Sequence, residues 1–263
     1  MRHAVDLALH LGFHRIWIDA LCIIQDDDND WKHEAARMAD VYANSVLTIA
    51  AWSASSCDEG LFTIRDPLSV GSCRIYDIAG ENESVFTMSL WSFNVPYEHS
   101  LRMKTPLYDR GWVLQERLFA PRTLNVGSLI SWECRTGNRS EFQPELSTFQ
   151  ISVKNIFNPT ESQDISTQHE RILTTWNKDI VPSFTDSRLT RKNDRFVAIS
   201  GAIQRLSAEK HWKKLHGLWE PFLVSQLHWY SGRSRQSPTT WNSERSGAAP
   251  TWSWASINGP VRY

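Results

Sequence analysis

The chain lacks most of the features that mark secreted, membrane-spanning or metal-binding proteins. Its four cysteines include no CxxC pair and have no histidine at zinc-finger spacing, so a structural zinc site is not expected. No apolar run reaches the roughly 20 residues that a membrane-spanning helix needs. The N-terminus also lacks the apolar core of a signal peptide. These absences predict an intracellular, cytoplasmic protein with reduced thiols and no membrane span.

Charge of one sign is also scarce, because the formal net charge is −1 over 263 residues. Nucleic acid is therefore not an expected partner. The phosphate-cradling motifs GxxxxGKS, GxxxxGKT and GxGxxG are absent. The acidic run that begins at Asp26 resembles a calcium loop, but Trp31 stands where that loop needs glycine and Arg37 where it needs glutamate. We expect no metal site and interpret the acidic run as the start of a helix.

What the sequence does have is an alternation of element types in its first fifty residues. Residues 2–11 show helical spacing of apolar side chains, and Gly12 ends that pattern. Residues 15–24 predict a strand buried on both faces, and residues 46–52 predict the next strand. Between them, Asp28 to Asp30 are cap candidates for a second helix. The apolar stripe of that helix consists of Trp31, Ala35, Met38 and Tyr42. This succession predicts an α/β fold with a parallel sheet.

The following segments predict β-hairpin additions to that parallel core. Residues 53–105 are weakly patterned, apart from short strands expected in CRIYDIA and SVFTMSLW. Asp109 is then expected to cap a helix that runs to Phe119 and stops before Pro121. RTLNV and LISWEC flank Gly127–Ser128, which is a hairpin turn signal.

The sequence predicts three parts: an α/β domain at 1–135, a polar connecting region at 136–192 and a mixed, largely helical region at 193–263. The connecting region contains one expected helix, at His169–Ile180. The last part has a helical stripe made of Phe196, Ile199, Ile203 and Leu206. GLWEPFLVSQLHWYS predicts another helix, and TWSWASI predicts a closing strand with both tryptophans on one face.

Two residues of the first predicted strand could carry chemistry. Asp19 lies in its C-terminal half, and ligand sites of α/β proteins gather beyond the carboxyl ends of parallel strands. A buried carboxylate must be paired or hydrogen-bonded. Asp19 therefore either anchors the fold or lines a site as a pocket or orienting residue. Cys22 could act as a nucleophile, but an apolar strand disfavours the thiolate and favours core packing.

The stretch RGWVLQER holds the other candidates. On a helix, Trp112 and Glu116 are i, i+4 neighbours on one face. An aromatic ring beside a carboxyl group can raise the pKa of that group and offers a stacking platform, which suits a ribose-binding carboxylate or a general base. Glu116 could take such a role, with Trp112 and Arg110 as pocket or orienting residues. The local sequence alone favours the alternative, an ordinary helix with Trp112 in the core. Glu116 would then pair with Arg110, Arg117 or Arg122.

Several stretches of the sequence together resemble one known family. They are LGFHRIWIDALCIIQDDDNDWKHEAARMADVYANSVLTIAA, GLF at residues 60–62, DRGWVLQERLFAPRTL and SWEC. These stretches resemble the fungal heterokaryon incompatibility (HET) domain. SRLTRKNDRFVAISGAIQRL, GLWEPFL and PTWSWASINGPV resemble the region that commonly follows it. The family usually has an extended YxALSYxWG-type segment before the first helix, which this sequence lacks, so the expected sheet would be without its first strand.

This resemblance implies a role in fungal nonself recognition and programmed cell death signalling. The HET domain is in turn remotely similar to TIR domains, which have flavodoxin-like parallel α/β folds. Some TIR domains hydrolyse NAD with a helical glutamate in a WxxxE-type context, and Trp112 and Glu116 stand at that spacing. The resemblance therefore implies Glu116 as the catalytic carboxylate and NAD as a substrate, with no bound cofactor required.

Three functions stay open at this point. The first is an enzyme of this signalling type that cleaves the nicotinamide–ribose bond of NAD. The second is a non-enzymatic module that acts by self-association or by recruiting other proteins, through the sheet edge or the Trp-rich C-terminal region. The third is an inactive family member shortened at its N-terminus.

Overall fold

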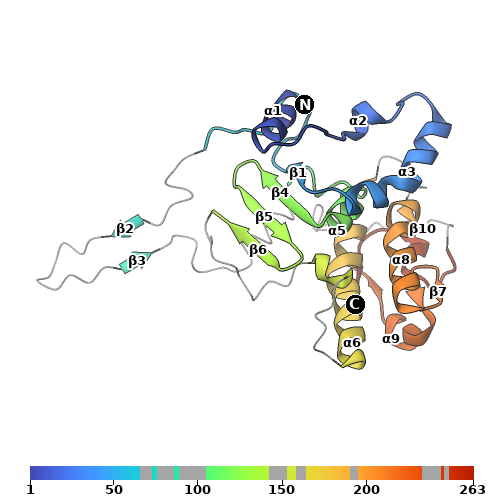
Figure 1. Cartoon of the computed structure of the whole chain (residues 1–263). Coiled ribbons are helices and arrows are strands. Elements are labelled where there is room, and N and C mark those ends of the chain that lie inside the picture. The colour runs from blue at the N-terminus through green and yellow to red at the C-terminus, as the bar shows by residue number, and fades with distance from the viewer. Residues whose placement is uncertain are drawn as a thin grey trace, which may run out of the picture.

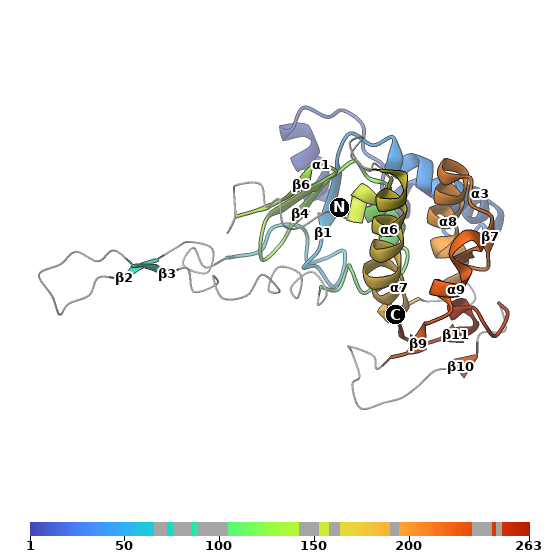
Figure 2. The same ribbon diagram turned by 90° about the horizontal axis from the view of Figure 1, so that it is seen from below.

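The computed structural model of the chain describes residues 1–65, 73–75, 86–88, 105–141, 153–157, 164–189, 195–232, 244–245 and 249–263. A four-stranded sheet lies beside a group of helices, and the N-terminal helices run along one border of the sheet (Figure 1). The view from below shows the longest C-terminal helices on one side of the sheet (Figure 2). None of the helices in the described ranges is long and apolar enough to cross a membrane.

The two long N-terminal helices follow the sequence pattern. Helix α1 spans Arg2–His10, and Gly12 follows it with a φ of 81°, which glycine adopts without strain. Helix α3 spans Asp28–Ala43, and its cap is Asp27, one residue before the predicted candidates. The Asp27 carboxylate accepts a hydrogen bond from the backbone N–H of Asn29 (2.8 Å). The acidic run therefore begins the helix, as the helix dipole favours.

The strand predicted for residues 15–24 is wrong. Residues 13–18 have no regular secondary structure, and Asp19–Cys22 forms one helical turn, α2. The apolar pattern implied cover on both faces, but no described strand pairs with this segment, and several of its large side chains are exposed. The most exposed are Ile16 (40%), Leu21 (63%) and Ile24 (56%). Cys22 is exposed too, so its predicted core position is also wrong.

The four-stranded sheet has the order β1-β4-β5-β6. Strand β1 (Thr48–Ala51) lies parallel to β4 (Arg122–Val126). Strands β4, β5 (Ser131–Cys134) and β6 (Gly137–Ser140) run antiparallel to one another. The α/β class is therefore confirmed with a mixed sheet. These four strands do not by themselves form the parallel, flavodoxin-like core that was predicted, because only β1 and β4 are parallel.

Both predicted hairpins have paired strands. Strands β2 (Cys73–Ile75) and β3 (Phe86–Met88) pair antiparallel within the two segments where short strands were expected. Strands β4 and β5 flank Gly127–Ser128, although the connecting loop is longer than two residues, at 127–130. The rest of the predicted pattern in residues 66–104 lies outside the described residues.

Residues 165–186 form an unbroken helical stretch. It consists of α6 (Ile165–Thr175), a π-helical turn η3 (Trp176–Ile180) and α7 (Val181–Asp186). The wide turn precedes Pro182, which has no N–H to donate within a regular helix. The most buried side chains, 0–1% exposed, are Trp176, Ile180, Val181 and Phe184. The prediction that residues 136–192 form a polar surface connection is therefore wrong for this stretch, whose apolar face enters the core.

The helix predicted from the stripe beginning at Phe196 is confirmed as α8, Val197–Lys210, and most of that stripe is buried. The helix predicted in GLWEPFLVSQLHWYS is shorter, because only residues 220–226 are helical. The short elements here are β7 (Lys214–Leu215), β8 (Leu218–Trp219), η5 (Glu220–Phe222), α9 (Leu223–Gln226), β9 (Tyr230–Ser231), β10 (Glu244–Arg245), β11 (Ile257–Asn258) and β12 (Val261–Arg262). They form the antiparallel pairs β7–β8, β9–β12 and β10–β11.

The strand predicted in TWSWASI is also wrong. Residues 254–256 form a 3₁₀ turn, η6 (Trp254–Ser256), which Ser253 caps through its hydroxyl. The two tryptophans therefore do not share a face: Trp252 is 40% exposed, whereas Trp254 is fully buried. Trp254 packs so closely on Gly217 that a Cβ there would lie 2.9 Å from the indole ring.

Candidate functional site

Helix α5 (Val113–Phe119) carries the main candidate residue. It ends before Pro121 as predicted, but the predicted cap is wrong, because the N-cap position is Trp112 and no side chain caps the helix. Trp112 itself has helical backbone angles, so Trp112 and Glu116 lie one turn apart. The most buried side chains of α5, at 1–3% exposure, are Val113, Gln115, Leu118 and Phe119.

Helix α5 is held between two other helices, with α8 on one side and α3 on another. On the α8 side, the Gln115 amide donates a hydrogen bond to the carbonyl oxygen of Val197 (3.3 Å). A Cβ at Gly201 would lie 3.2 Å from the Gln115 Oε1, so the contact between the two helices is close. Glu116 is the side chain of α5 that meets α3 through Tyr42.

The Glu116 carboxyl group lies in a cluster of polar groups from three elements. Its neighbours are the Tyr42 hydroxyl from α3, the Asp19 carboxylate from α2 and the Arg110 guanidinium from the turn before α5. Burial raises the pKa of Glu116 to about 7, although a hydrogen bond with Tyr42 and the Arg110 charge oppose the shift, and the Asp19 charge adds to it. The residue keeps a small exposed fraction. Glu116 can therefore change its charge near neutral pH.

Tyr42 is the partner that sequence reasoning missed. Its burial, together with the Glu116 charge and hydrogen bond, raises the pKa of its hydroxyl far above the ordinary value. It therefore stays protonated and acts as a hydrogen-bond donor to the carboxylate. The Trp17 ring meets the Tyr42 ring edge-on, with 5.7 Å between ring centroids. The sequence offered only one signal, the membership of Tyr42 in the apolar stripe of its helix, and that signal indicated packing.

Trp112 lies beside the cluster. Its ring meets the Trp31 ring edge-on at 5.9 Å, and it packs partly against the hydrophobic core. Both tryptophans are half-buried. This ring contact joins the start of α5 to the first turn of α3, one helical turn before Glu116.

The two remaining candidates, Asp19 and Arg110, also affect the charge state of Glu116. Asp19 does so from a position that the sequence did not predict. Asp19 was predicted within a buried strand, but it is half-buried in the first turn of α2, where its carboxylate accepts the backbone N–H of Ala20 (2.7 Å). Arg110 is exposed, and its charge favours the ionised form of Glu116. The structure therefore brings Asp19, Arg110 and Glu116 into one electrostatic cluster.

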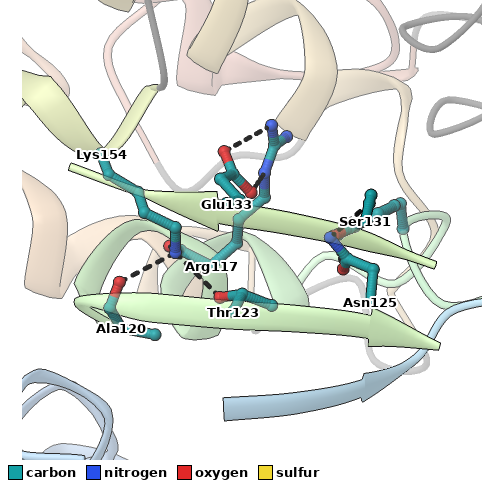
Figure 3. Close-up of polar contacts among 8 residues, drawn as sticks. Arg117, Ala120, Thr123, Asn125, Ser131, Glu133 and Lys154 are labelled. Atoms are coloured by element: carbon teal, nitrogen blue, oxygen red, sulfur yellow. Dashed lines mark hydrogen bonds and ion pairs between the residues drawn. The ribbon is translucent and has the colours of Figure 1, made fainter. Parts of the chain in front are cut away.

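A second polar network holds α5 against the sheet (Figure 3). The Arg117 guanidinium donates two hydrogen bonds to the fully buried Glu133 carboxylate on β5 (2.8 and 3.0 Å). Burial disfavours the charged form of Arg117, but the Glu133 charge outweighs this effect and raises the pKa of Arg117, which favours the charged pair. The pair therefore joins α5 to the sheet.

Lys154 closes the C-terminal end of α5 from η2 (Val153–Phe157). Lys154 is only 1% exposed. Its ammonium donates hydrogen bonds to the carbonyl oxygens of Arg117 and Ala120 (2.8 Å for Ala120) and to the Thr123 hydroxyl (3.0 Å). A cation at this end also complements the helix dipole. Residues 136–192 had been predicted as a surface connection, so no sequence signal identified this lysine.

The network continues along the sheet through neutral hydrogen bonds. The Tyr108 hydroxyl donates to Asn125 Oδ1 on β4 (2.7 Å), and the Asn125 amide donates to the Ser131 hydroxyl on β5 (3.1 Å). Arg117 lies over the Tyr108 ring, 5.3 Å from its centroid. Asn125 and Ser131 are buried, and these groups bond to one another, so they position α5 rather than forming a ligand site.

The Glu116 cluster therefore combines a carboxylate of near-neutral pKa, a hydroxyl donor, a second carboxylate, a cation and indole rings. This set can bind sugar hydroxyls, stabilise a developing positive charge and stack on a planar ring. Within the described ranges, no group of three His, Cys, Asp or Glu side chains is arranged to hold a metal ion.

The fold and this cluster define a mixed α/β protein with a carboxylate-containing site between α3 and α5. Residues 1–116 match the family described as heterokaryon incompatibility protein (HET), so the family resemblance expected from the sequence is confirmed for this part of the chain. The matched part includes all residues of the cluster, from Asp19 to Glu116. No curated protein and no solved structure matches the chain.

Proposed function

We propose that this protein acts inside the cell in heterokaryon-incompatibility-type nonself recognition and cell death signalling, by hydrolysing NAD at the Glu116 cluster. The family match supports the signalling role. The observation that carries the enzymatic role is the placement of Glu116 beside Tyr42, Asp19 and Arg110, with a pKa of about 7. Near-neutral carboxylates of this kind are concentrated at catalytic sites.

The proposed reaction cleaves the bond between nicotinamide and the adjacent ribose. The electron pair of that bond leaves with nicotinamide, and a water molecule adds to the ribosyl carbon and loses a proton, which gives ADP-ribose and nicotinamide. The ionised Glu116 binds ribose hydroxyls and stabilises the positive charge that develops on the sugar. Trp112 and Trp31 offer apolar surface for a planar base, and Arg110 offers a cation for phosphate.

The test is expression in yeast of the full chain, of Glu116→Gln and of the matched surface variant Glu220→Gln. Growth and cellular NAD are followed together. We expect the full chain and Glu220→Gln to lower NAD and slow growth, and Glu116→Gln to do neither while reaching the same abundance. Equal NAD loss with Glu116→Gln would exclude Glu116 as the catalytic carboxylate. Slow growth at unchanged NAD in all three would favour a function without catalysis.

A specific observation favours a second candidate function, in which the protein is an interaction or self-association module. Most of the exposed large apolar side chains among the described residues belong to residues 1–64. Along α1 and its N-cap residue Met1, the side chains of Met1, Val5 and Leu9 recur at four-residue spacing and are 43%, 37% and 55% exposed. β1 lies at one end of the described strand order, beside this region (Figure 1). Contiguous exposed apolar surface of this kind marks interaction sites.

Light scattering over a range of protein concentrations tests this second function. A module of this type gives concentration-dependent oligomers, and the double variant Val5→Glu, Leu9→Lys lowers their mass without changing the unfolding transition. A chain that stays monomeric at the highest concentration contradicts it.

A further inference from the structure

Two arginines that are far apart in the sequence lie side by side on the surface next to α5. Arg110 and Arg188 form a parallel β-bridge outside the named strands. The Arg188 N–H donates to the carbonyl oxygen of Asp109 (2.5 Å), and the Gly111 N–H donates to the carbonyl oxygen of Arg188 (2.9 Å). Because paired backbones in a sheet lie about 4.8 Å apart, the two arginine side chains start from neighbouring positions.

The packing around Gly111 shows which way the two arginines point. A Cβ at Gly111 would lie 2.6 Å from Cδ2 of Leu189 and 3.1 Å from Oγ of Ser187. Gly111, Ser187 and Leu189 therefore share the inward face of the bridge, where Leu189 packs against the hydrophobic core. Successive residues of an extended backbone point to opposite faces, so Arg110 and Arg188 share the outward face. Both arginines are exposed, as this arrangement requires.

The bridge places two positive charges on one small patch of surface. Neighbouring cations repel each other, and an anion bound between them removes this cost. A guanidinium binds phosphate oxygens through paired hydrogen bonds, so two adjacent guanidiniums suit a ligand with several phosphate oxygens. Arg110 precedes Trp112 by two residues, and Glu116 lies one helical turn beyond Trp112. The pair therefore borders the proposed site at the end where α5 begins.

We propose that Arg110 and Arg188 together bind the diphosphate group of a dinucleotide whose ribose lies at Glu116. This inference rests on the proposed function, because it assigns the phosphate-binding part of the same site. Arg188 lies outside residues 1–116, which match the HET family, and no motif of the sequence predicted it as a site residue. The second half of the chain thereby contributes a binding residue to the site.

Calorimetric titration with inorganic pyrophosphate tests the pair without any cleavage. The variants are Arg110→Gln and Arg188→Gln. Arg139→Gln on β6 is the matched control, because Arg139 is also exposed and its loss changes the net charge equally. We expect each of the first two variants to weaken pyrophosphate binding about tenfold or more, since each removes charge-assisted hydrogen bonds. The control should bind pyrophosphate like the unmodified protein.

Absence of pyrophosphate binding by the unmodified protein overturns the proposal, and so does equal affinity in Arg188→Gln and Arg139→Gln. Arg188→Lys keeps the positive charge but loses the paired donors, so its affinity should lie between those of the unmodified protein and Arg188→Gln. If Arg188→Gln does not fold, Arg110→Gln and Arg188→Lys decide in its place. An affinity equal to that of the control in either of them overturns the proposal.

Nicotinamide release separates this inference from the proposed function. In Arg188→Gln, the KM for NAD should rise about tenfold or more, with a smaller change in kcat. Cleavage of nicotinamide riboside, which has the same bond but no phosphate, should be unchanged. If the pair binds pyrophosphate but the unmodified protein cleaves no NAD, the proposed function fails and the phosphate-binding role of the pair stands. If NAD is cleaved and Arg188→Gln alters neither KM nor pyrophosphate affinity, the pair fails and the proposed function stands.

Discussion

The C-terminal part of the chain and the helices α1 and α2 place their large apolar side chains differently. Trp176, Trp219 and Trp254 are fully buried. Trp176 and Trp219 meet at 4.8 Å between ring centroids. In the N-terminal region, by contrast, large apolar side chains on α1 and α2 remain at the surface. Helix α5 belongs to both environments, since Leu118 and Phe119 enter the core while Glu116 faces α3.

This contrast indicates which part of the molecule stabilises α5 and where the proposed site lies. A dense aromatic core packs against one side of α5 and fixes the helix in place. The other side of α5 can therefore carry Glu116 at a partly desolvated position, where ionisation of the carboxyl group is unfavourable. The proposed site therefore depends on the C-terminal region even though the family match ends at residue 116.

The largest expected effect comes from truncating the aromatic core. Trp176→Ala should lower the free energy of unfolding by about 3–5 kcal/mol, because it removes a fully buried indole and leaves a cavity. The N-terminal control, Leu9→Ala, should change it by less than about 0.5 kcal/mol, since that side chain is 55% exposed. Urea unfolding measures both, and similar losses would contradict the contrast.

Breaking the link between α5 and the sheet should come next. Glu133→Gln leaves the Arg117 guanidinium without its buried counter-charge and should cost about 3 kcal/mol. The surface pair of Lys213 and Glu220, at 2.7 Å, supplies the control, and Glu220→Gln should cost less than about 1 kcal/mol. Thermal unfolding of both variants tests this, and an equal cost would mean that the buried pair does not fix α5.

The third effect depends on pH, and here the substitution is expected to raise the free energy of unfolding rather than lower it. In the folded chain Glu116 has a pKa of about 7, above its ordinary value of 4.5, so the folded state keeps a proton that the unfolded state releases between these values. Stability therefore falls as pH rises through this window. Glu116→Gln removes this loss, and above the window it should be more stable than the unmodified protein by about 2–3 kcal/mol. Unfolding curves across the window check this, and identical pH slopes would contradict it.

The smallest effect lies at the start of α3. Asp27→Ala removes the side chain that accepts the Asn29 N–H and should cost about 1 kcal/mol. Asp26→Ala is the matched control, because Asp26 precedes the cap and its removal should change stability by less than about 0.5 kcal/mol. Helix content and the urea midpoint report both, and equal effects would mean that Asp27 does not act as the cap.

The spacing of apolar residues in the sequence predicted the helices and strands that bury one continuous apolar face. Helices α1, α3 and α8, strand β1 and the hairpin around Gly127–Ser128 follow from local pattern and turn chemistry. It failed for residues 15–24 because an apolar run indicates burial but does not say which layers will cover it. The helix predicted at His169–Ile180 is confirmed within residues 165–186, but the pattern did not indicate its burial, because the buried face is mixed with many polar residues.

The site was predictable only in part, for a related reason. The spacing of Trp112 and Glu116 within one helix is visible in the sequence. The hydrogen bond from Tyr42 and the cap from Lys154 join elements that are far apart in the chain. Such tertiary contacts leave no local pattern, and each of these residues also fits an ordinary packing or surface role.

The central claim is that Glu116 is a catalytic carboxylate held under strain, and one comparison tests it most directly. Purified full chain, Glu116→Gln and Glu220→Gln are incubated with NAD, and release of nicotinamide is measured beside the unfolding free energy of each. The account predicts that Glu116→Gln alone loses nicotinamide release while becoming more stable above neutral pH. Undiminished release by Glu116→Gln, or no release by any of the three, would contradict it.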